Sequence, residues 1–512
     1  MLELLGTLVH IDSNKPGAVE SDAGFIAPGT PGNWQCEAFD TGNNISGYAD
    51  EQSIFSVKIM FALAITWFVT YFCVFKGVKS SSYVVWITVP GPILFIFIMV
   101  INGLCLPNAD EGIRMYLRGE VDGKVPLLSE KLADGQMWAD AAGQIFFSLG
   151  VCMGVMTSYA SYNRRNKPII RDVFFISFGN CLLSFYAGFA VFSIVGYLRW
   201  LGSPVAQKTS SSGLAFVAYP AAAETMPYSN FWTMILGLTL FLLGIDTAFS
   251  LVEAISTVVY DVAWGKKVPR KLTALIICVV GWCFSLLFAS SWGYTYFDVV
   301  DRYISVYLMF VLGIMQCFGA GWMFRYNKLT TEGTNKNSIM LLTLIYWGSL
   351  IVCGPVTVFM LGSNSSTGIP MYWGIFAFWG MTIFGVVLSY VMRNKETTDL
   401  KTWYEQVFLY GAHELALEVC DRHDELRVPG KSSNPWWKQP FIFWWGFSIK
   451  YFIPWALYQL MMWNFKADLT FDITTGRSYG NYHVFWQCMG FVFPAIGLVL
   501  FIVPIFWFWG EK

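Results

Sequence analysis

Two acidic residues lie inside a long apolar stretch of the sequence, which runs from Phe231 to Asp261. Asp246 is near its middle and Glu253 follows seven residues later, so a helix would place both on one face. The stretch is longer than the ~20 residues that span a bilayer, and a carboxylate at that depth is costly unless something pairs with it. Either the acid is protonated and hydrogen-bonded within a helix bundle, or it binds an ion. We favour the ion site.

Neutral polar residues earlier in the chain offer a second kind of site. Gln144 and Ser148 are four residues apart in one apolar segment, and Asn180 and Ser184 are four apart in the next. Residues at this spacing share one face of a helix. Four hydrogen-bonding groups with no base nearby could hold a small anion or line a wet cavity, and the spacing alone supports both interpretations equally.

Glycines punctuate the segment that contains Gln144 and Ser148. Gly150 and Gly154 could let two helices pack closely. They could equally mark an interrupted helix, whose backbone groups become available to a substrate or to ions. The polar side chains nearby favour the interrupted helix.

The composition is that of a multi-pass membrane protein. Of 512 residues, 55% are hydrophobic and only 13% are charged, and the mean hydropathy is +0.50. The net charge of -1 gives no indication of a nucleic-acid partner. The eleven cysteines lie mostly in apolar runs, where they are expected to behave as small hydrophobic residues rather than as a disulfide framework.

The hydropathy pattern predicts an all-α protein with about eleven membrane spans. They are expected near residues 55–75, 83–105, 139–162, 172–200, 230–261, 271–290, 303–324, 338–361, 370–392, 441–463 and 483–509. Lys and Arg cluster in the short loops on one side, which places the N-terminus outside and the C-terminus inside the cell. The exterior tail, residues 1–54, carries a glycosylation sequon at Asn44.

The loop over residues 393–440 contains the candidates for metal chemistry. His413, Cys420 and His423 match no zinc spacing, and a helix over residues 402–423 that lies on the membrane face is the simpler interpretation. The sequence contains no nucleophile elbow, phosphate-binding loop or HExxH motif. We therefore expect no enzymatic activity.

Seven stretches, in order, resemble the neurotransmitter:sodium symporter family. They are KGVKSSSYVVWITVPG (76–91), INGLCLPNADEGIRMYL (101–117), WADAAGQIFFSLG (138–150), SYNRRN with the run ending in VGYL (161–198), GLAFVAYPAAAETMP (213–227), LGIDTAF (243–249) and FDVVDRY (297–303). The last two spans, with IKYFIPWALY at 449–458, resemble family helices 11 and 12 more weakly.

The resemblance implies an incomplete inverted-repeat transporter bundle. Residues 1–54 resemble the second extracellular loop, 55–325 resemble family helices 4–10, 326–440 form an inserted helix pair with a cytosolic loop, and 441–512 resemble helices 11–12. Family helices 1–3 have no counterpart in this sequence, so a separate chain could supply them. The family binds its substrate and ions where helices 1 and 6 unwind, against helices 3 and 8.

The resemblance also assigns roles to individual residues. It implies sodium ligands at Leu243, Asp246 and Thr247 for one site and at Ser148 and Asn180 for another, a chloride site at Gln144, Ser148, Asn180 and Ser184, and a substrate pocket at Phe147, Gly150, Met153, Ala248 and Leu251. Chloride-independent relatives carry an acid where Ser184 stands, so a neutral serine implies chloride coupling. Leu251 fills a position that is often glycine, which suggests a small substrate.

Together these features predict a sodium-dependent and chloride-dependent symporter. It would import a small amino acid, a neurotransmitter-like amine or an osmolyte across the plasma membrane, with Na⁺ and Cl⁻ as co-transported ions and no other cofactor. Its expected partners are the lipid bilayer and a small-molecule substrate. The alternative is a truncated remnant that transports nothing, acting as a membrane scaffold or as one half of a split protein that needs a partner.

Overall fold

The computed structural model describes most of the chain after residue 54 and is helical almost throughout. It covers residues 55–119, 125, 132, 135–164, 167, 169–203, 218–262, 265–290, 292–324, 336–360, 372–393, 399–425, 438–468 and 484–509. Within these ranges the extended structure is one isolated β-bridge between Phe55 and Ser290. The prediction of an all-α protein is confirmed.

The chain divides into two compact units, each with its own core. The first comprises Met1–Glu130, Gly154–Tyr162 and Ser177–Asp298, and the second comprises Lys131–Met153, Asn163–Ile176 and Val299–Lys512. Two helices, α10 (Ile170–Trp200) and α16 (Gly293–Arg302), contribute residues to both units.

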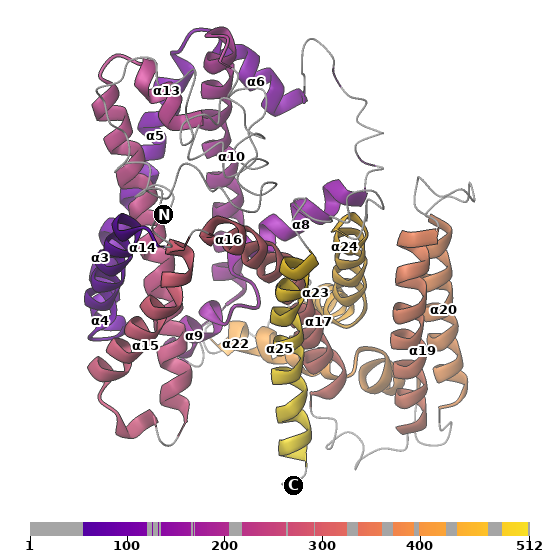
Figure 1. Ribbon diagram of the computed structural model, residues 1–512. Helices are drawn as coiled ribbons and strands as arrows, with labels where there is room; N and C mark the ends of the chain where they lie inside the picture. The colour runs from indigo at the N-terminus through magenta and orange to yellow at the C-terminus, as the bar shows by residue number, and fades with distance from the viewer. Residues whose placement is uncertain are drawn as a thin grey trace. The chain divides into compact units, whose positions relative to one another are not determined.

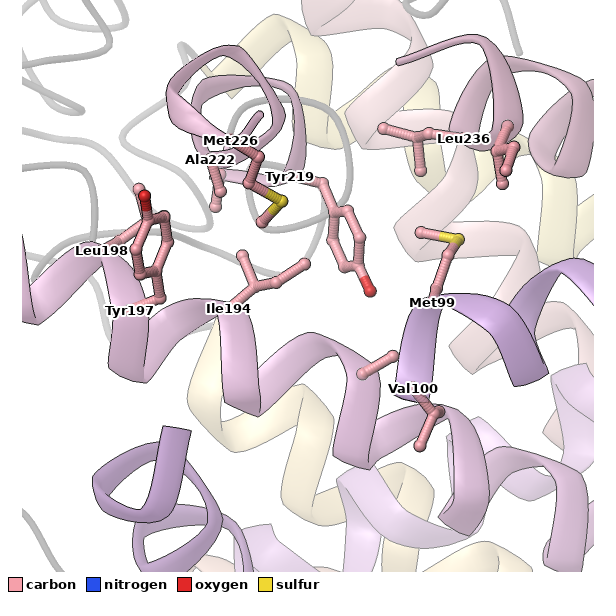
Figure 2. Packing of buried hydrophobic residues seen from close by; sticks show 12 residues of the cluster. Met99, Val100, Ile194, Tyr197, Leu198, Tyr219, Ala222, Met226 and Leu236 are labelled. Atoms are coloured by element: carbon pink, nitrogen blue, oxygen red, sulfur yellow. The ribbon is translucent and has the colours of Figure 1, made fainter. Parts of the chain in front are cut away.

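The first unit is built around the long helix α14 (Ser229–Asp261), as Figure 1 shows. Its other elements are α3 (Val57–Val74), α4 (Val78–Thr88), α5 (Pro90–Leu104), α6 (Ala109–Arg118), α9 (Val155–Ser161), α13 (Tyr219–Thr225), η2 (Gly265–Lys267), α15 (Arg270–Ser285) and η3 (Leu286–Ala289). Helices α3, α4, α5, α9, α13 and α15 all pack on α14. In one core cluster, Tyr219 of α13 projects between Ile194 of α10 and Met99 of α5 (Figure 2). Burial of these apolar side chains holds α14 in place.

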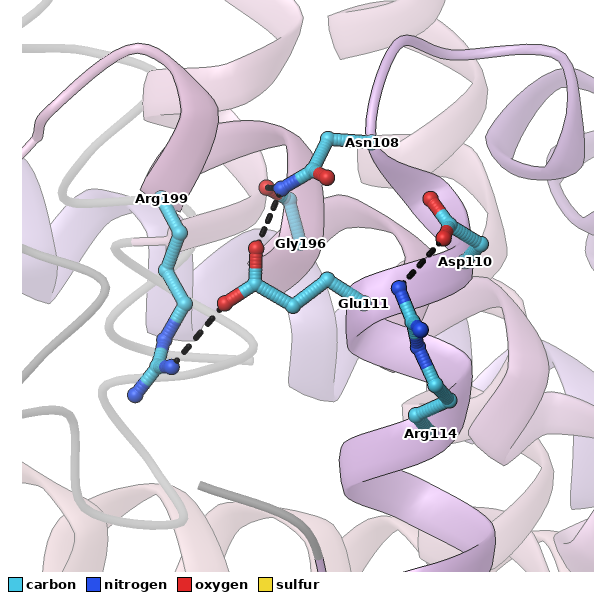
Figure 3. Close-up of polar contacts among 6 residues, drawn as sticks. All are labelled: Asn108, Asp110, Glu111, Arg114, Gly196 and Arg199. Atoms are coloured by element: carbon cyan, nitrogen blue, oxygen red, sulfur yellow. Dashed lines mark hydrogen bonds and ion pairs between the residues drawn. The ribbon is translucent and has the colours of Figure 1, made fainter. Parts of the chain in front are cut away.

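Polar contacts fix α6 against the end of α10 in the same unit (Figure 3). Asn108 donates to the Gly196 carbonyl at 3.4 Å, and Arg199 pairs with Glu111 at 3.3 Å. The helices approach so closely that a Cβ atom on Gly112 would lie 1.8 Å from the carbonyl oxygen of Phe192. Glycine is therefore required at this crossing.

The second unit has an aromatic core. Its elements are α8 (Gly135–Leu149), the π-helical η4 (Tyr303–Leu308), α17 (Met309–Phe318), η5 (Gly319–Met323), α19 (Lys336–Pro355), η6 (Val356–Met360), α20 (Tyr372–Val391), α21 (Leu400–Trp403), η7 (Tyr404–Leu409), α22 (Gly411–Glu425), α23 (Lys438–Phe447), η8 (Ser448–Phe452), α24 (Ile453–Asp468) and α25 (Val484–Trp509). Helices α19 and α20 lie side by side (Figure 1). Tyr346 of α19 stacks on Trp322 with ring centroids 5.4 Å apart and meets Tyr451 edge-on at 5.4 Å.

Eight helical runs among the described residues are long and apolar enough to span a bilayer. They are Val57–Val74, Ser80–Leu104, Ile170–Trp200, Ser229–Asp261, Arg270–Ala289, Thr295–Met323, Asn337–Val358 and Trp373–Val391. The chain is therefore an integral multi-pass membrane protein.

The three other expected spans are helical but differ from the eight. Residues 135–161 are interrupted in the middle, and residues 438–468 contain Lys450, Lys466 and Asp468 among many Trp and Tyr residues. The apolar part of α25 extends over Cys488–Val499.

The prediction of one helix over residues 402–423 is wrong. The π-helical η7 ends at Leu409, Tyr410 has φ +50°, and α22 starts at Gly411. The Tyr410 side chain is fully buried, so tertiary packing overrides the local helix propensity here.

Candidate functional site

The three residues expected to bind sodium through α14 lie together on one face of that helix. Leu243, Asp246 and Thr247 occupy positions i, i+3 and i+4, and the Thr247 hydroxyl donates to the Leu243 carbonyl at 3.1 Å. Asp246 is half-buried, whereas Thr247 is exposed. The arrangement presents a carbonyl, a carboxylate and a hydroxyl oxygen in close proximity.

Asp246 has a partner that the sequence did not suggest. The hydroxyl of Thr88, the last residue of α4, donates to Asp246 Oδ1 at 2.7 Å. Thr88 itself is buried, at 3% exposure. Its place two residues before Pro90, a residue that weakens or kinks a helix, is the one local signal that could have marked it.

The polar face of α14 continues past Asp246 toward the end of the helix. Tyr159 of α9 donates to Ser250 at 3.3 Å, and Tyr162, just after α9, donates to Glu253 at 3.4 Å. Glu253 is only 3% exposed. The expectation that both acids share one face of this helix is confirmed.

The helix that contains Gly150 and Gly154 is interrupted, as the sequence predicts. α8 ends at Leu149, and α9 begins only at Val155. Between them Gly150, Cys152 and Gly154 have φ values of +60°, +68° and +79°. These left-handed conformations break the ladder of helical hydrogen bonds, and Cys152 adopts one despite having a side chain, which is a strained arrangement typical of functional sites.

Phe147 lies on the accessible side of α8. Its neighbour Phe146 meets Phe310 of α17 edge-on, with ring centroids 5.7 Å apart. Phe147 is 48% exposed and therefore does not share this buried position.

The remaining predicted residues are divided between the two units. Gln144, Phe147, Ser148, Gly150 and Met153 belong to the second unit, whereas Asn180, Ser184, Leu243, Asp246, Thr247, Ala248 and Leu251 belong to the first. Gln144 and Ser148 share a face of α8, and Asn180 and Ser184 share a face of α10, as their spacing indicates. The joint anion site and the joint substrate pocket stay predictions.

The described residues contain no group of three His, Cys, Asp or Glu side chains that could hold a metal ion. In α22, Cys420 is fully buried and His413 is half-buried. Burial lowers the pKa of His413, against the opposite influence of Glu405 and Glu414. The side chain of His423 and the sequon at Asn44 lie outside the described part of the structure.

Comparison with known proteins places the chain in a transporter family. The model of the sodium:neurotransmitter symporter family matches residues 38–395. The chain belongs to this family. The resemblance seen in the sequence is thereby confirmed.

The sodium:neurotransmitter symporters similar to this chain are transporters of small molecules. The sodium- and chloride-dependent GABA transporter 2 of Rattus norvegicus is 34% identical over 274 residues, which is 52% of this chain and 44% of the relative. The sodium- and chloride-dependent taurine transporter of Bos taurus is 33% identical over 311 residues, covering 59% of this chain and 48% of the relative. The chain thus spans about half the length of these relatives.

Proposed function

We propose that this chain serves sodium-dependent and chloride-dependent symport of a small amino acid or a related osmolyte across the plasma membrane. The single observation that carries the proposal is the half-buried Asp246 on α14, with the Leu243 carbonyl and the Thr247 hydroxyl beside it. A carboxylate at this depth is stabilised by a bound cation. The names of the relatives, which are GABA and taurine transporters, support substrates of this size and the coupling to sodium and chloride.

The interrupted helix would supply the second half of the binding region. The stretch between Gly150 and Gly154 has backbone groups outside the helical ladder, and such groups bind substrates and ions in transporters. Ser148 and Asn180 would complete another sodium site, and Phe147 would close over the substrate. Met153, Ala248 and Leu251 would line the pocket with Gly150, and the leucine would limit it to small substrates.

Four neutral polar residues would bind chloride. Gln144, Ser148, Asn180 and Ser184 are neutral hydrogen-bonding residues, so a bound anion would supply the negative charge that balances sodium. The N-terminus would lie outside and the C-terminus inside, as the charge distribution of the loops favours. The inward sodium gradient would then drive the substrate into the cell.

Uptake by the purified full chain in liposomes tests the proposal. Labelled GABA and taurine should enter when sodium, but not choline, is supplied outside, and replacing chloride by gluconate should reduce uptake. Asp246→Asn should abolish the sodium-dependent part, whereas Asp261→Asn, at an exposed position at the end of the same helix, should leave it unchanged. Sodium-dependent uptake that survives in Asp246→Asn would refute the role of this carboxylate.

A second pair of variants addresses chloride separately. Ser184→Glu introduces a fixed negative charge and should make uptake independent of chloride. Ser184→Ala introduces none and should keep uptake chloride-dependent. Full uptake by the unaltered chain in gluconate would rule out chloride coupling.

A further inference from the structure

Thr88 bonds differently from Thr70 and Thr239, two other buried threonines in helices of the first unit. Thr70 and Thr239 each donate their hydroxyl to the carbonyl four residues earlier in their own helix, at 2.8 and 2.7 Å. Thr88 instead donates across to a second helix, to the carboxylate of Asp246 at 2.7 Å. A hydroxyl bonded to a carboxylate forms a shorter and stronger hydrogen bond than one bonded to a neutral carbonyl.

The position of Thr88 in the chain explains why its side chain can point across. It is the last residue of α4, and Pro90 begins α5 directly afterwards. Proline has no N–H group, so one of the backbone hydrogen bonds between the last turn of α4 and the first turn of α5 is missing. Packing against a neighbouring helix therefore helps to set the orientation of this joint.

The joint packs against α14 at the sodium-binding stretch. A Cβ atom on Gly91 would lie 3.1 Å from the Leu242 side chain, which is one turn before Asp246. The close approach at Gly91 and the hydrogen bond at Thr88 hold the joint at two neighbouring points of α14. Thr88 is therefore fixed relative to the carboxylate rather than meeting it by chance.

We propose that Thr88 is a positioning residue for sodium at Asp246. Its hydroxyl occupies Oδ1, fixes the rotation of the carboxylate and leaves Oδ2 directed to the ion. In the low-dielectric surroundings of the helix bundle the same bond stabilises the ionised acid while no cation is bound. The inference rests on the proposed function, since it concerns the sodium site of the transporter.

The variant Thr88→Val keeps the shape of the side chain and removes the donor. It should raise the sodium concentration for half-maximal uptake about tenfold, as expected for a lost hydrogen bond to a charged group, with the maximal rate retained. Thr88→Ser restores a donor and should recover a sodium dependence close to that of the unaltered chain. Thr70→Val is the matched control, because Thr70 is equally buried but bonds only within α3, and should change neither parameter.

Sodium-induced thermal stabilisation of the purified full chain in detergent, with choline as the reference cation, gives a readout that does not require transport. Thr88→Val should need about ten times more sodium for the same shift, and Thr88→Ala serves in its place if the valine variant does not fold. Two results would overturn the role of Thr88 alone. One is that Thr88→Val needs no more sodium than the unaltered chain for the same thermal shift. The other is that Thr88→Ser needs as much sodium as Thr88→Val. A sodium effect absent from the unaltered chain, or retained in Asp246→Asn, would instead overturn the proposed function and this inference with it.

Discussion

Asp246 in the first unit and Lys450 in the second unit are ionisable side chains that the protein encloses to different extents. Asp246 in the first unit is half-buried and accepts one hydrogen bond, from Thr88. Lys450 in the second unit is 0% exposed, and its ammonium nitrogen donates to the Val407 carbonyl at 2.8 Å. The first carboxylate keeps an accessible side, whereas the lysine is enclosed completely.

Aromatic rings supply most of the enclosure around Lys450. Its Nζ lies 4.3 Å from the ring centroid of Trp322, 5.3 Å from that of Tyr410 and 5.5 Å from that of Tyr451. Ring faces attract a cation by about 2 kcal/mol when water is excluded. Trp322 lies in η5, Val407 lies in η7, and the lysine itself lies in η8, so Lys450 links three segments that are distant in sequence. The lysine is therefore enclosed by protein on every side, whereas the carboxylate of Asp246 keeps a side that a ligand can reach.

The largest expected effect follows directly from this difference. Lys450→Ala removes the bond to Val407 and leaves a cavity among the rings, which should lower the free energy of unfolding by about 3–5 kcal/mol. Lys450→Met fills the volume but leaves the carbonyl without its donor, so we expect a loss of about 1–3 kcal/mol. Asp246→Asn, in sodium-free buffer, can still accept from Thr88 and should lose less than either variant.

Equilibrium unfolding in mixed SDS micelles measures all three variants on one scale. Equal destabilisation of Asp246→Asn and Lys450→Ala without sodium would contradict the larger structural role of Lys450. If added sodium stabilised Asp246→Asn as much as the unaltered chain, Asp246 would not be the sodium-binding residue.

The second unit also contains a largely buried ion pair. Arg302 pairs with Asp468 at 3.1 Å, and the Tyr307 hydroxyl donates to the same carboxylate at 2.6 Å. Arg302→Leu leaves a carboxylate of only 7% exposure without its cation, which should cost about 3 kcal/mol. Adding Asp468→Leu should recover part of this loss, because no uncompensated charge is left. A double-mutant cycle measures the coupling, and strictly additive losses would show that the pair does not act as a unit.

In the first unit, α6 and α10 pack closely at a distance from Asp246. Two glycines of α10 differ in how closely they meet a neighbouring helix. A Cβ atom on Gly196 would lie 2.6 Å from the Asn108 carbonyl, whereas one on Gly179 in the same helix would meet nothing within 4 Å. Gly196→Ala should therefore destabilise the protein by about 1–3 kcal/mol through overpacking. Gly179→Ala should stabilise it by up to about 1 kcal/mol through helix propensity. The same unfolding assay applies, and equal effects of the two substitutions would mean that α6 and α10 can separate freely.

Much of the fold could be predicted because apolar length alone specifies a membrane helix. The expected span 230–261 corresponds to α14 at Ser229–Asp261, and 172–200 corresponds to α10 at Ile170–Trp200. The interruption at Gly150 was also foreseeable, since glycines and polar residues occur together there. These features depend on residues close together in sequence.

The features that sequence reasoning missed depend on contacts between distant residues. Thr88 meets Asp246 across 158 positions, and Lys450 meets Val407 across 43, so no local pattern announces either bond. The helix break at Tyr410 has the same origin, because that ring is buried beside Lys450. Spacing predicts which residues share a face, but the partner opposite that face depends on tertiary packing.

His413 gives the smallest expected effect and extends the comparison to an ionisable group outside the predicted spans. Its side chain is half-buried in α22, and burial lowers its pKa below the ordinary value of 6.5. The unfolded chain therefore takes up a proton at this histidine at a higher pH than the folded chain does. Stability should fall as the pH drops through 6.5 and stop falling below the folded pKa.

Thermal unfolding of the unaltered chain and of His413→Gln across this pH range separates the contribution of this residue from that of other groups. The glutamine variant cannot be protonated, so its midpoint should depend less on pH between neutrality and about pH 5. Identical pH profiles would mean that His413 is as accessible to protons in the folded chain as in the unfolded one. Partial burial, as at His413, would then leave the proton affinity of a side chain unchanged. Only complete burial, as at Lys450, would remove an ionisable group from exchange with the solvent.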